Sequence, residues 1–184
     1  MEYIPAYRRL LDSGELDARA EQALEHLKKC DLCPIACKVD RSIGRLGTCK
    51  TARRARVSSC FPHMGEEDPL RGRFGSGTIF FSNCNLRCQY CQNYTISQEG
   101  EGRTVDAGEL AAMMLDLQAM RCHNINLVSP THVVAQIIEA VALAARRGLN
   151  IPLVYNSGGY DSLSALALLD GIVDIYMPDM KYGN

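Results

Sequence analysis

The stretch CNLRCQYCQN holds three cysteines at the spacing C-x3-C-x2-C, namely Cys84, Cys88 and Cys91. Thiolates at this density are ligands for iron-sulfur clusters or for zinc. The stretch supplies no fourth cysteine or histidine, so a cluster held by these thiolates would keep one metal atom with a free coordination position. A free position on a metal is where a cofactor or substrate can bind and react. The alternative is a zinc site that takes its fourth ligand from elsewhere, such as Cys122 or His123.

A second group of cysteines lies earlier in the chain, at Cys30, Cys33, Cys37 and Cys49. Its spacing is C-x2-C-x3-C-x11-C, and four thiolates are enough to close a tetrahedral metal site. The metal would be zinc, which would staple a small module, or iron in an auxiliary cluster that relays electrons or binds substrate. We expect the structural role, because this segment has few periodic apolar residues with which to fold alone.

The composition is that of a globular, cytoplasmic protein. Of the 184 residues, 47% are hydrophobic and 22% are charged, which suffices for a substantial core. The net charge is −1, so we expect no nucleic acid or membrane surface as a partner. The start of the chain has no apolar signal segment, and no later stretch has the apolar length of a membrane span. Nine cysteines in a cytoplasmic protein indicate metal or redox chemistry rather than disulfides, and their odd number supports this interpretation.

The elements that must position these cysteines alternate between strands and helices. Apolar and β-branched runs predict four strands: TIFFSN at 78–83, INLVS at 125–129, IPLVYN at 151–156 and IVDIYM at 172–177. Helical periodicity predicts three helices between them, which begin at Asp106, after Thr131 and at Ser162. Asp106 and Glu109 form the pattern of a capping box, and Thr131 is the expected cap of its helix.

Strict alternation of strands and helices predicts a parallel sheet with right-handed crossovers. A doubly wound dinucleotide fold would carry G-x-G-x-x-G after its first strand, where this chain has cysteines. A TIM-like barrel places its site at the carboxyl ends of the strands, and here those ends carry CNLRCQYC, SPTH, NSGGYD and PDMKY. We therefore predict the α/β class, with the first four strands of a TIM-like parallel (β/α) barrel.

We expect two parts in the chain. Residues 1–72 would contain an amphipathic helix at 15–29 and a small cysteine-rich metal-binding module, because residues 30–60 show no regular periodicity. Residues 73–184 would form the partial barrel. A full barrel has about eight strand-helix units, so we expect these four to be the amino-terminal fragment of a longer fold.

The cysteine motif directly after the first strand of such an alternation resembles the signature of the radical S-adenosylmethionine superfamily. The resemblance implies that Cys84, Cys88 and Cys91 hold a four-iron, four-sulfur cluster, whose open iron binds the amino and carboxylate groups of S-adenosylmethionine. An electron from the cluster would cleave this cofactor to methionine and a 5′-deoxyadenosyl radical. The resemblance also implies that Tyr90 packs near the adenine, and the alternative is a loop aromatic that only covers the cluster.

Within the superfamily, CDLCPIAC, GEEDPLRG, INLVSPTHV and DIYMPDMKYG resemble the pyruvate formate-lyase activating enzyme-related branch, with its PflX-like and AmmeMemoRadiSam-type proteins. In that branch Gly-Gly-Glu usually follows the second strand and meets the amino group of S-adenosylmethionine. This chain has Ser129, Pro130, Thr131 and His132 there. We therefore expect backbone and hydroxyl groups at Ser129 and Thr131 to hold the cofactor instead.

Polar residues at the next two strand ends complete the expected cofactor site. Asn156 lies at the end of the third strand, where a plain turn is the alternative interpretation. Asp179 and Lys181 resemble the D-x-K of the family, which implies a carboxylate for the ribose hydroxyls and an ammonium for the methionine carboxylate. A surface ion pair is the alternative for these two residues.

The expected function is that of a radical S-adenosylmethionine enzyme of activating-enzyme, oxidoreductase type. It would abstract hydrogen from a protein or another substrate, and a donor such as flavodoxin or ferredoxin would supply the electron. A non-catalytic iron-sulfur or zinc-binding module in electron transfer or assembly is the alternative. The open coordination and the polar strand ends favour the enzyme, whereas the short barrel and the missing Gly-Gly-Glu favour the module.

Overall fold

The computed structural model describes residues 3–180, and a mixed sheet of six strands in the order β3-β1-β2-β4-β5-β6 forms its centre. Four neighbouring strands run parallel: β2 (Ser76–Phe81), β4 (Ile125–Val128), β5 (Leu153–Ser157) and β6 (Ile175–Pro178). These are the four strands that the apolar runs predict, with small shifts at their ends. The fold is therefore of the mixed α/β class, and a partial barrel remains a prediction.

Two further strands, which the sequence patterns do not predict, extend the sheet beyond β2. β1 (Ala55–His63) pairs antiparallel with β2, and β3 (Arg103–Val105) pairs antiparallel with β1. β1 overlaps the segment in which no periodicity is visible. Its pattern is weak because the register shifts between Val57 and Ser59, which interrupts the alternation of buried and exposed residues.

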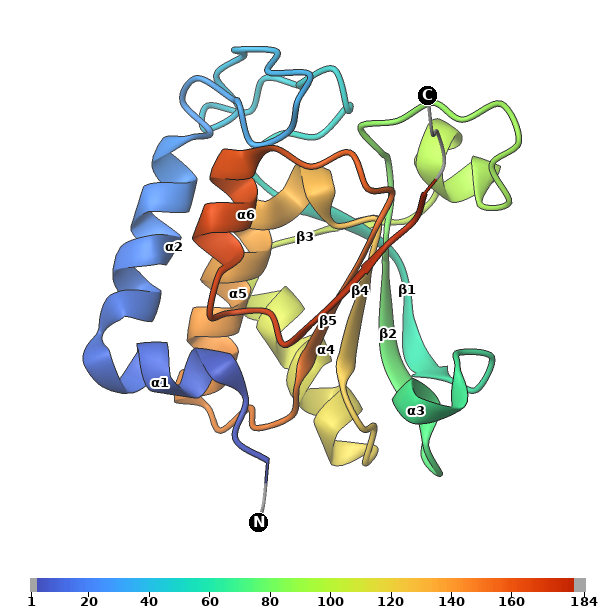
Figure 1. Ribbon diagram of the computed structural model, residues 1–184. Helices are drawn as coiled ribbons and strands as arrows, with labels where there is room; N and C mark the ends of the chain where they lie inside the picture. Colours follow the sequence, from blue (N-terminus) through green and yellow to red (C-terminus); the bar gives the residue numbers. More distant parts are fainter. Residues whose placement is uncertain (1–2, 181–184) are drawn as a thin grey trace.

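Five helices lie on one side of the sheet (Figure 1). They are α1 (Ala6–Ser13), α2 (Glu15–Glu25), α4 (Ala107–Ala119), α5 (Val134–Arg146) and α6 (Leu163–Leu169). α5 is buried on almost its whole circumference because α1, α2, α4 and α6 all pack against it. A short helix, α3 (Asp68–Arg71), lies on the other side of the sheet, before β2 (Figure 1).

The predicted starts of two helices are confirmed. Asp106 accepts a hydrogen bond from the N–H of Glu109 at 2.9 Å, and the Glu109 carboxylate accepts one from the N–H of Asp106 at 3.0 Å. The capping box of α4 is therefore complete. At α6, the Ser162 hydroxyl accepts a hydrogen bond from the N–H of Ala165.

The prediction that Thr131 caps the helix after it is wrong. Residues 131–133 form a short 3₁₀ turn, η2, before α5, and no side chain caps α5. The Thr131 hydroxyl donates to the carboxylate of Asp161 instead, at 2.6 Å. A hydrogen bond to an ionised carboxylate is stronger than the bond that a hydroxyl makes as a helix cap. Thr131 therefore bonds to Asp161 and does not cap the helix.

One hydrophobic core joins the amino-terminal helices to the sheet. Tyr7 of α1, Leu16 of α2 and Leu27 belong to the same buried cluster as Ile79 of β2 and Ile137 of α5. The expected division of the chain at residue 72 remains a prediction. Within residues 3–180, no helix is both long enough and apolar enough to cross a lipid bilayer.

Candidate functional site

The three-cysteine loop begins directly after β2, at the end of the sheet where the parallel strands finish (Figure 1). Asn83 has a φ of 70°, a left-handed conformation that Asn tolerates better than most residues, and this turns the chain out of the strand. The Asn83 amide donates to the carbonyl of Lys50 and to the hydroxyl of Thr51. A π-helical turn, η1 (Thr95–Glu99), follows the cysteines. The loop is thus anchored before Cys84 by contacts to the amino-terminal loops.

The thiols of this loop lie near enough to influence one another. Burial raises the pKa of the Cys84 thiol, the N–H of Leu86 lowers it, and the Cys88 and Cys91 thiols raise it again. Within residues 3–180, no three His, Cys, Asp or Glu side chains are arranged to hold a single metal ion. An iron-sulfur cluster contains several iron atoms, so its thiolates need not point at one place.

A pocket of about 1000 Å³ lies in front of the loop. Seven predicted site residues line it: Cys84, Cys88, Tyr90, Cys91, Ser129, Asn156 and Asp179. They come from the carboxyl ends of β2, β4, β5 and β6, which the parallel sheet brings side by side. A pocket of this size suits a ligand as large as a nucleoside with an amino-acid substituent.

The backbone at the ends of β4 and β5 shapes one wall of the pocket. Ser129 has a φ of 58°, which is uncommon for a residue with a Cβ atom. Its N–H donates to the Asn156 carbonyl at 3.0 Å, and the N–H of Asp179 donates to the Ser157 carbonyl at 2.9 Å. Strained residues of this kind gather at functional sites, so the strain at Ser129 marks this wall as a candidate contact surface for a ligand.

The remaining predicted residues differ in how the structure describes them. Thr131 is buried and does not line the pocket, because its hydroxyl is bonded to Asp161. Tyr90 lines the pocket but is 99% exposed. Lys181 falls outside the described residues.

The opposite wall of the pocket contains residues that sequence reasoning missed. His63, at the end of β1, and Glu66, in the loop before α3, line this wall together with Phe80 of β2, whose ring centroid lies 6.4 Å from that of His63. The Glu66 carboxylate accepts a hydrogen bond from the amide of the buried Asn126 at 3.0 Å. Burial raises the pKa of the Glu66 carboxyl, Glu67 raises it further, and His63 lowers it. In the sequence, the feature that could have pointed to a polar partner such as Glu66 is Asn126, a polar residue within the apolar run INLVS.

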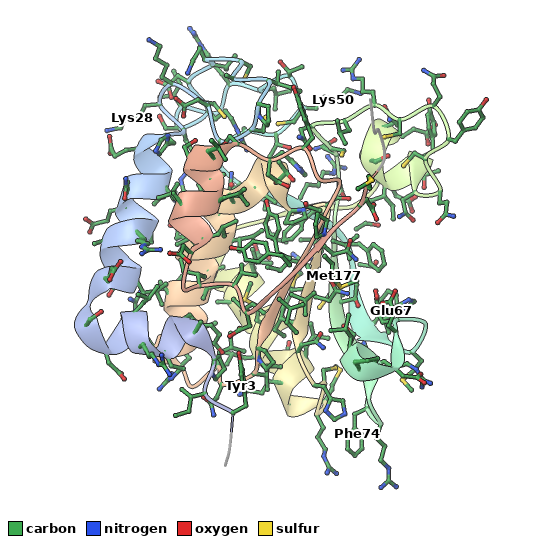
Figure 2. The ribbon with its side chains drawn as sticks, in the orientation of Figure 1. Tyr3, Lys28, Lys50, Glu67, Phe74 and Met177 are labelled. Carbon is green, nitrogen blue, oxygen red and sulfur yellow. The ribbon has the colours of Figure 1, made fainter. Side chains whose placement is uncertain are left out.

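The second cysteine group lies in the loops between α2 and β1, at the same end of the molecule as the three-cysteine loop (Figure 1). Lys50, next to Cys49, projects from these loops (Figure 2). Its ammonium donates to the carbonyl of Gln98 in η1, at 3.0 Å. The two cysteine-bearing regions are therefore in contact, although the second group does not line the pocket.

Comparison with known proteins identifies the class that this fold and site define. The family model of the Radical SAM superfamily matches residues 78–184, which is more than half of the chain. The chain therefore belongs to the radical S-adenosylmethionine superfamily. An uncharacterized protein of Methanocaldococcus jannaschii is 33% identical over 177 residues, which cover 92% of this chain. The chain spans about 50% of that relative's length. No solved structure matches this chain.

Membership of the superfamily implies a four-iron, four-sulfur cluster and S-adenosylmethionine as cofactors. The residues present fit these cofactors, since three neighbouring thiols border a pocket of suitable size. The resemblance to the pyruvate formate-lyase activating enzyme-related branch remains a prediction, because the matched relative is itself uncharacterized.

Proposed function

We propose that this chain binds the four-iron, four-sulfur cluster through Cys84, Cys88 and Cys91 and cleaves S-adenosylmethionine reductively in the adjoining pocket. The observation that carries the proposal is the pocket itself, in which three thiols face polar residues from the ends of three further parallel strands. The bound cofactors would supply methionine and a 5′-deoxyadenosyl radical, which removes hydrogen from the substrate.

The chain's own residues would position the cofactor. The backbone and hydroxyl of Ser129 would meet its amino group, and the amide of Asn156 lies beside them. Asp179 would accept hydrogen bonds from the ribose hydroxyls, and Lys181 would pair with the methionine carboxylate. The amide of Asn85 donates to the Tyr160 carbonyl at 3.0 Å, which would keep the cysteine loop in register with the strand end that carries Asn156.

The finer assignment is to the activating enzyme-related branch, with an oxidoreductase-type reaction on a protein or another substrate. The substrate would enter over the wall formed by His63, Glu66 and Phe80. The electron would come from a donor such as flavodoxin or ferredoxin, which can approach the loop because Cys88 and Cys91 are only half-buried. The four parallel strands would then be strands of a TIM-like barrel.

Anaerobic reconstitution with iron and sulfide tests the proposal. The chain should turn brown, the electron paramagnetic resonance spectrum of the reduced protein should change when S-adenosylmethionine is added, and 5′-deoxyadenosine should form. Cys88→Ser should abolish all three signals, whereas Cys60→Ser, at a half-buried cysteine outside the pocket, should keep them. A brown protein that neither responds to S-adenosylmethionine nor cleaves it would support the non-catalytic module instead.

A further inference from the structure

The cysteines of the amino-terminal loops form a compact group of their own. Cys30, Cys33 and Cys49 are buried, Cys37 is half-buried, and all four thiols are free. The Cys30 and Cys37 thiols lie close enough to shift each other's pKa, and the Cys30 and Cys49 thiols raise the pKa of Cys33. A Cβ atom added to Gly47 would lie 3.4 Å from the Cys37 sulfur and 3.5 Å from the Cys49 sulfur. Each thiol therefore has another beside it, and Gly47 lies next to the sulfurs of Cys37 and Cys49.

The backbone of these loops directs N–H groups at sulfur. Burial raises the pKa of the Cys30, Cys33 and Cys37 thiols, and in each case the N–H group two residues later in the chain lowers it. Ala36 and Lys38, on either side of Cys37, have φ values of 42° and 57°, which are costly for residues with a Cβ atom. The loop thus adopts an unfavourable backbone that presents N–H groups to the thiols.

Arg41 places a positive charge inside the same group. Its side chain is 1% exposed, and its guanidinium donates to the Cys30 sulfur at 3.4 Å and to the carbonyls of His132 and Ala52 at 3.0 and 3.2 Å. Among residues 3–180, no carboxylate forms an ion pair with Arg41. A buried guanidinium needs a negatively charged partner, which a thiolate supplies and a neutral thiol does not.

We infer that Cys30, Cys33, Cys37 and Cys49 bind one zinc ion as four thiolates, with Arg41 as the neighbouring counter-charge. Four local ligands on short turns are typical of structural zinc, and such a site is closed to substrate. Four thiolates around Zn²⁺ carry a net charge of −2, of which the guanidinium offsets one unit. Within the described residues, no three of these sulfurs are arranged to hold one ion, so the side chains would have to adjust when zinc binds.

Zinc at this position would stabilise the start of the three-cysteine loop. Arg41 bonds to the His132 carbonyl, and the His132 ring bonds to the Ser82 carbonyl at 3.0 Å, two residues before Cys84. A second connection runs from Asn83 to the loop that follows Cys49. The inference does not depend on the proposed function, because the zinc ligands and the pocket residues are different sets.

Metal titration of the reduced chain, after removal of bound metal with a chelator, tests the inference. We expect one Zn²⁺ per chain to bind in competition with a chromophoric chelator, and Co²⁺ to give the intense visible bands of four-thiolate tetrahedral coordination. Cys88→Ser should leave both results unchanged, whereas Cys33→Ser should abolish them. Should Cys33→Ser fail to fold, the Co²⁺ spectra of the wild-type and Cys88→Ser chains still decide the number of thiolates.

Three outcomes would overturn the inference: no stoichiometric Zn²⁺ binding, loss of binding in Cys88→Ser, or a Cys88→Ser protein that turns brown on reconstitution with iron and sulfide. The last would assign an iron-sulfur cluster to these four cysteines.

Arg41→Met should weaken Zn²⁺ binding about 10- to 100-fold, as loss of a ligand's hydrogen-bond partner usually does. Arg45→Met, on an exposed residue of the same loop, should leave the affinity unchanged.

Discussion

Asp161 accepts hydrogen bonds from three side chains behind the pocket wall. Thr131 and Tyr155 donate to one carboxylate oxygen at 2.6 and 2.8 Å, and Ser157 donates to the other at 2.7 Å. Thr131 follows β4, whereas Tyr155 and Ser157 belong to β5, so one carboxylate ties two adjacent strand ends together. Asp161 therefore positions the backbone that carries Ser129 and Asn156.

Asp161→Asn should destabilise the chain by about 2 kcal/mol, because hydrogen bonds to an ionised acceptor are stronger than bonds to an amide. For a chain of this length the loss corresponds to roughly 6 °C in Tm. Differential scanning calorimetry would measure it. Asp12→Asn, on the exposed surface of α1, is the control. Equal Tm values for the two variants would show that Asp161 has no such role.

His132 is a buried histidine whose neutral form is favoured. Burial lowers the pKa of His132 to about 4, and the charge of Arg41 lowers it as well, against the opposing effect of the Ser82 carbonyl. The pKa in the folded state thus lies below the unfolded value of about 6.5. The stability that this group contributes is complete above about pH 6.5 and is lost as the pH falls towards 4.

His132→Gln should therefore make the free energy of unfolding less dependent on pH on the acid side. Between about pH 6.5 and 4 the wild type should lose up to about 3 kcal/mol more than the variant. Urea unfolding followed by circular dichroism at several pH values would measure this difference. Parallel curves for the two proteins would contradict it.

The site residues were only partly predictable. The spacing of Cys84, Cys88 and Cys91 predicts a metal site by itself, because the three thiols are close in sequence. Glu66 and Asp161 could not be found in this way, because their roles depend on Asn126 and Thr131, which are distant in sequence. Thr131 was instead assigned a local role, as a helix cap, whereas its hydroxyl bonds to Asp161, which is 30 residues away in the sequence.

Among the secondary-structure elements, α4 has the clearest start. Its capping box satisfies N–H groups that the helix cannot bond internally. Asp106→Ala should cost about 1 kcal/mol of stability. Asp116→Ala, on the exposed side of the same helix, should change stability by less than about 0.5 kcal/mol. Chemical denaturation of both variants would check the contrast, which equal losses would refute.

The parallel strands were predictable because each lies in an apolar run bounded by polar turns, and helices separate these runs. β1 was not predictable, because its register shift breaks the alternation of buried and exposed residues and Pro62 lies within the strand. Its partner β3 has only three residues, too few for a periodic pattern. Antiparallel additions of this kind are decided by pairing with a neighbour, here β2, and single-strand patterns do not contain that information.

At the scale of the whole molecule, β6 forms one edge of the described sheet. Ile175 and Tyr176 on this strand are 38% and 43% exposed, and exposed apolar edge strands favour pairing between molecules. Ile175→Lys should therefore reduce the concentration-dependent self-association of the 184-residue chain, as sedimentation velocity would show. Leu163→Lys, at a residue of α6 that is 85% exposed, should not reduce it. Equal effects of both substitutions would exclude the edge as the cause.

The exposure of the three-cysteine loop has a chemical consequence. Tyr90 at its tip is almost fully exposed, and Cys88 and Cys91 are only half-buried, so a cluster in this loop would lie close to bulk water. The short path that lets a reductant approach is equally open to dioxygen, which oxidises iron-sulfur clusters to forms that lose iron. In air the cluster should decay within the folded protein, while the buried thiols of the amino-terminal loops stay protected. Air exposure followed by analysis of both iron and zinc would therefore separate the two cysteine groups by how long each keeps its metal.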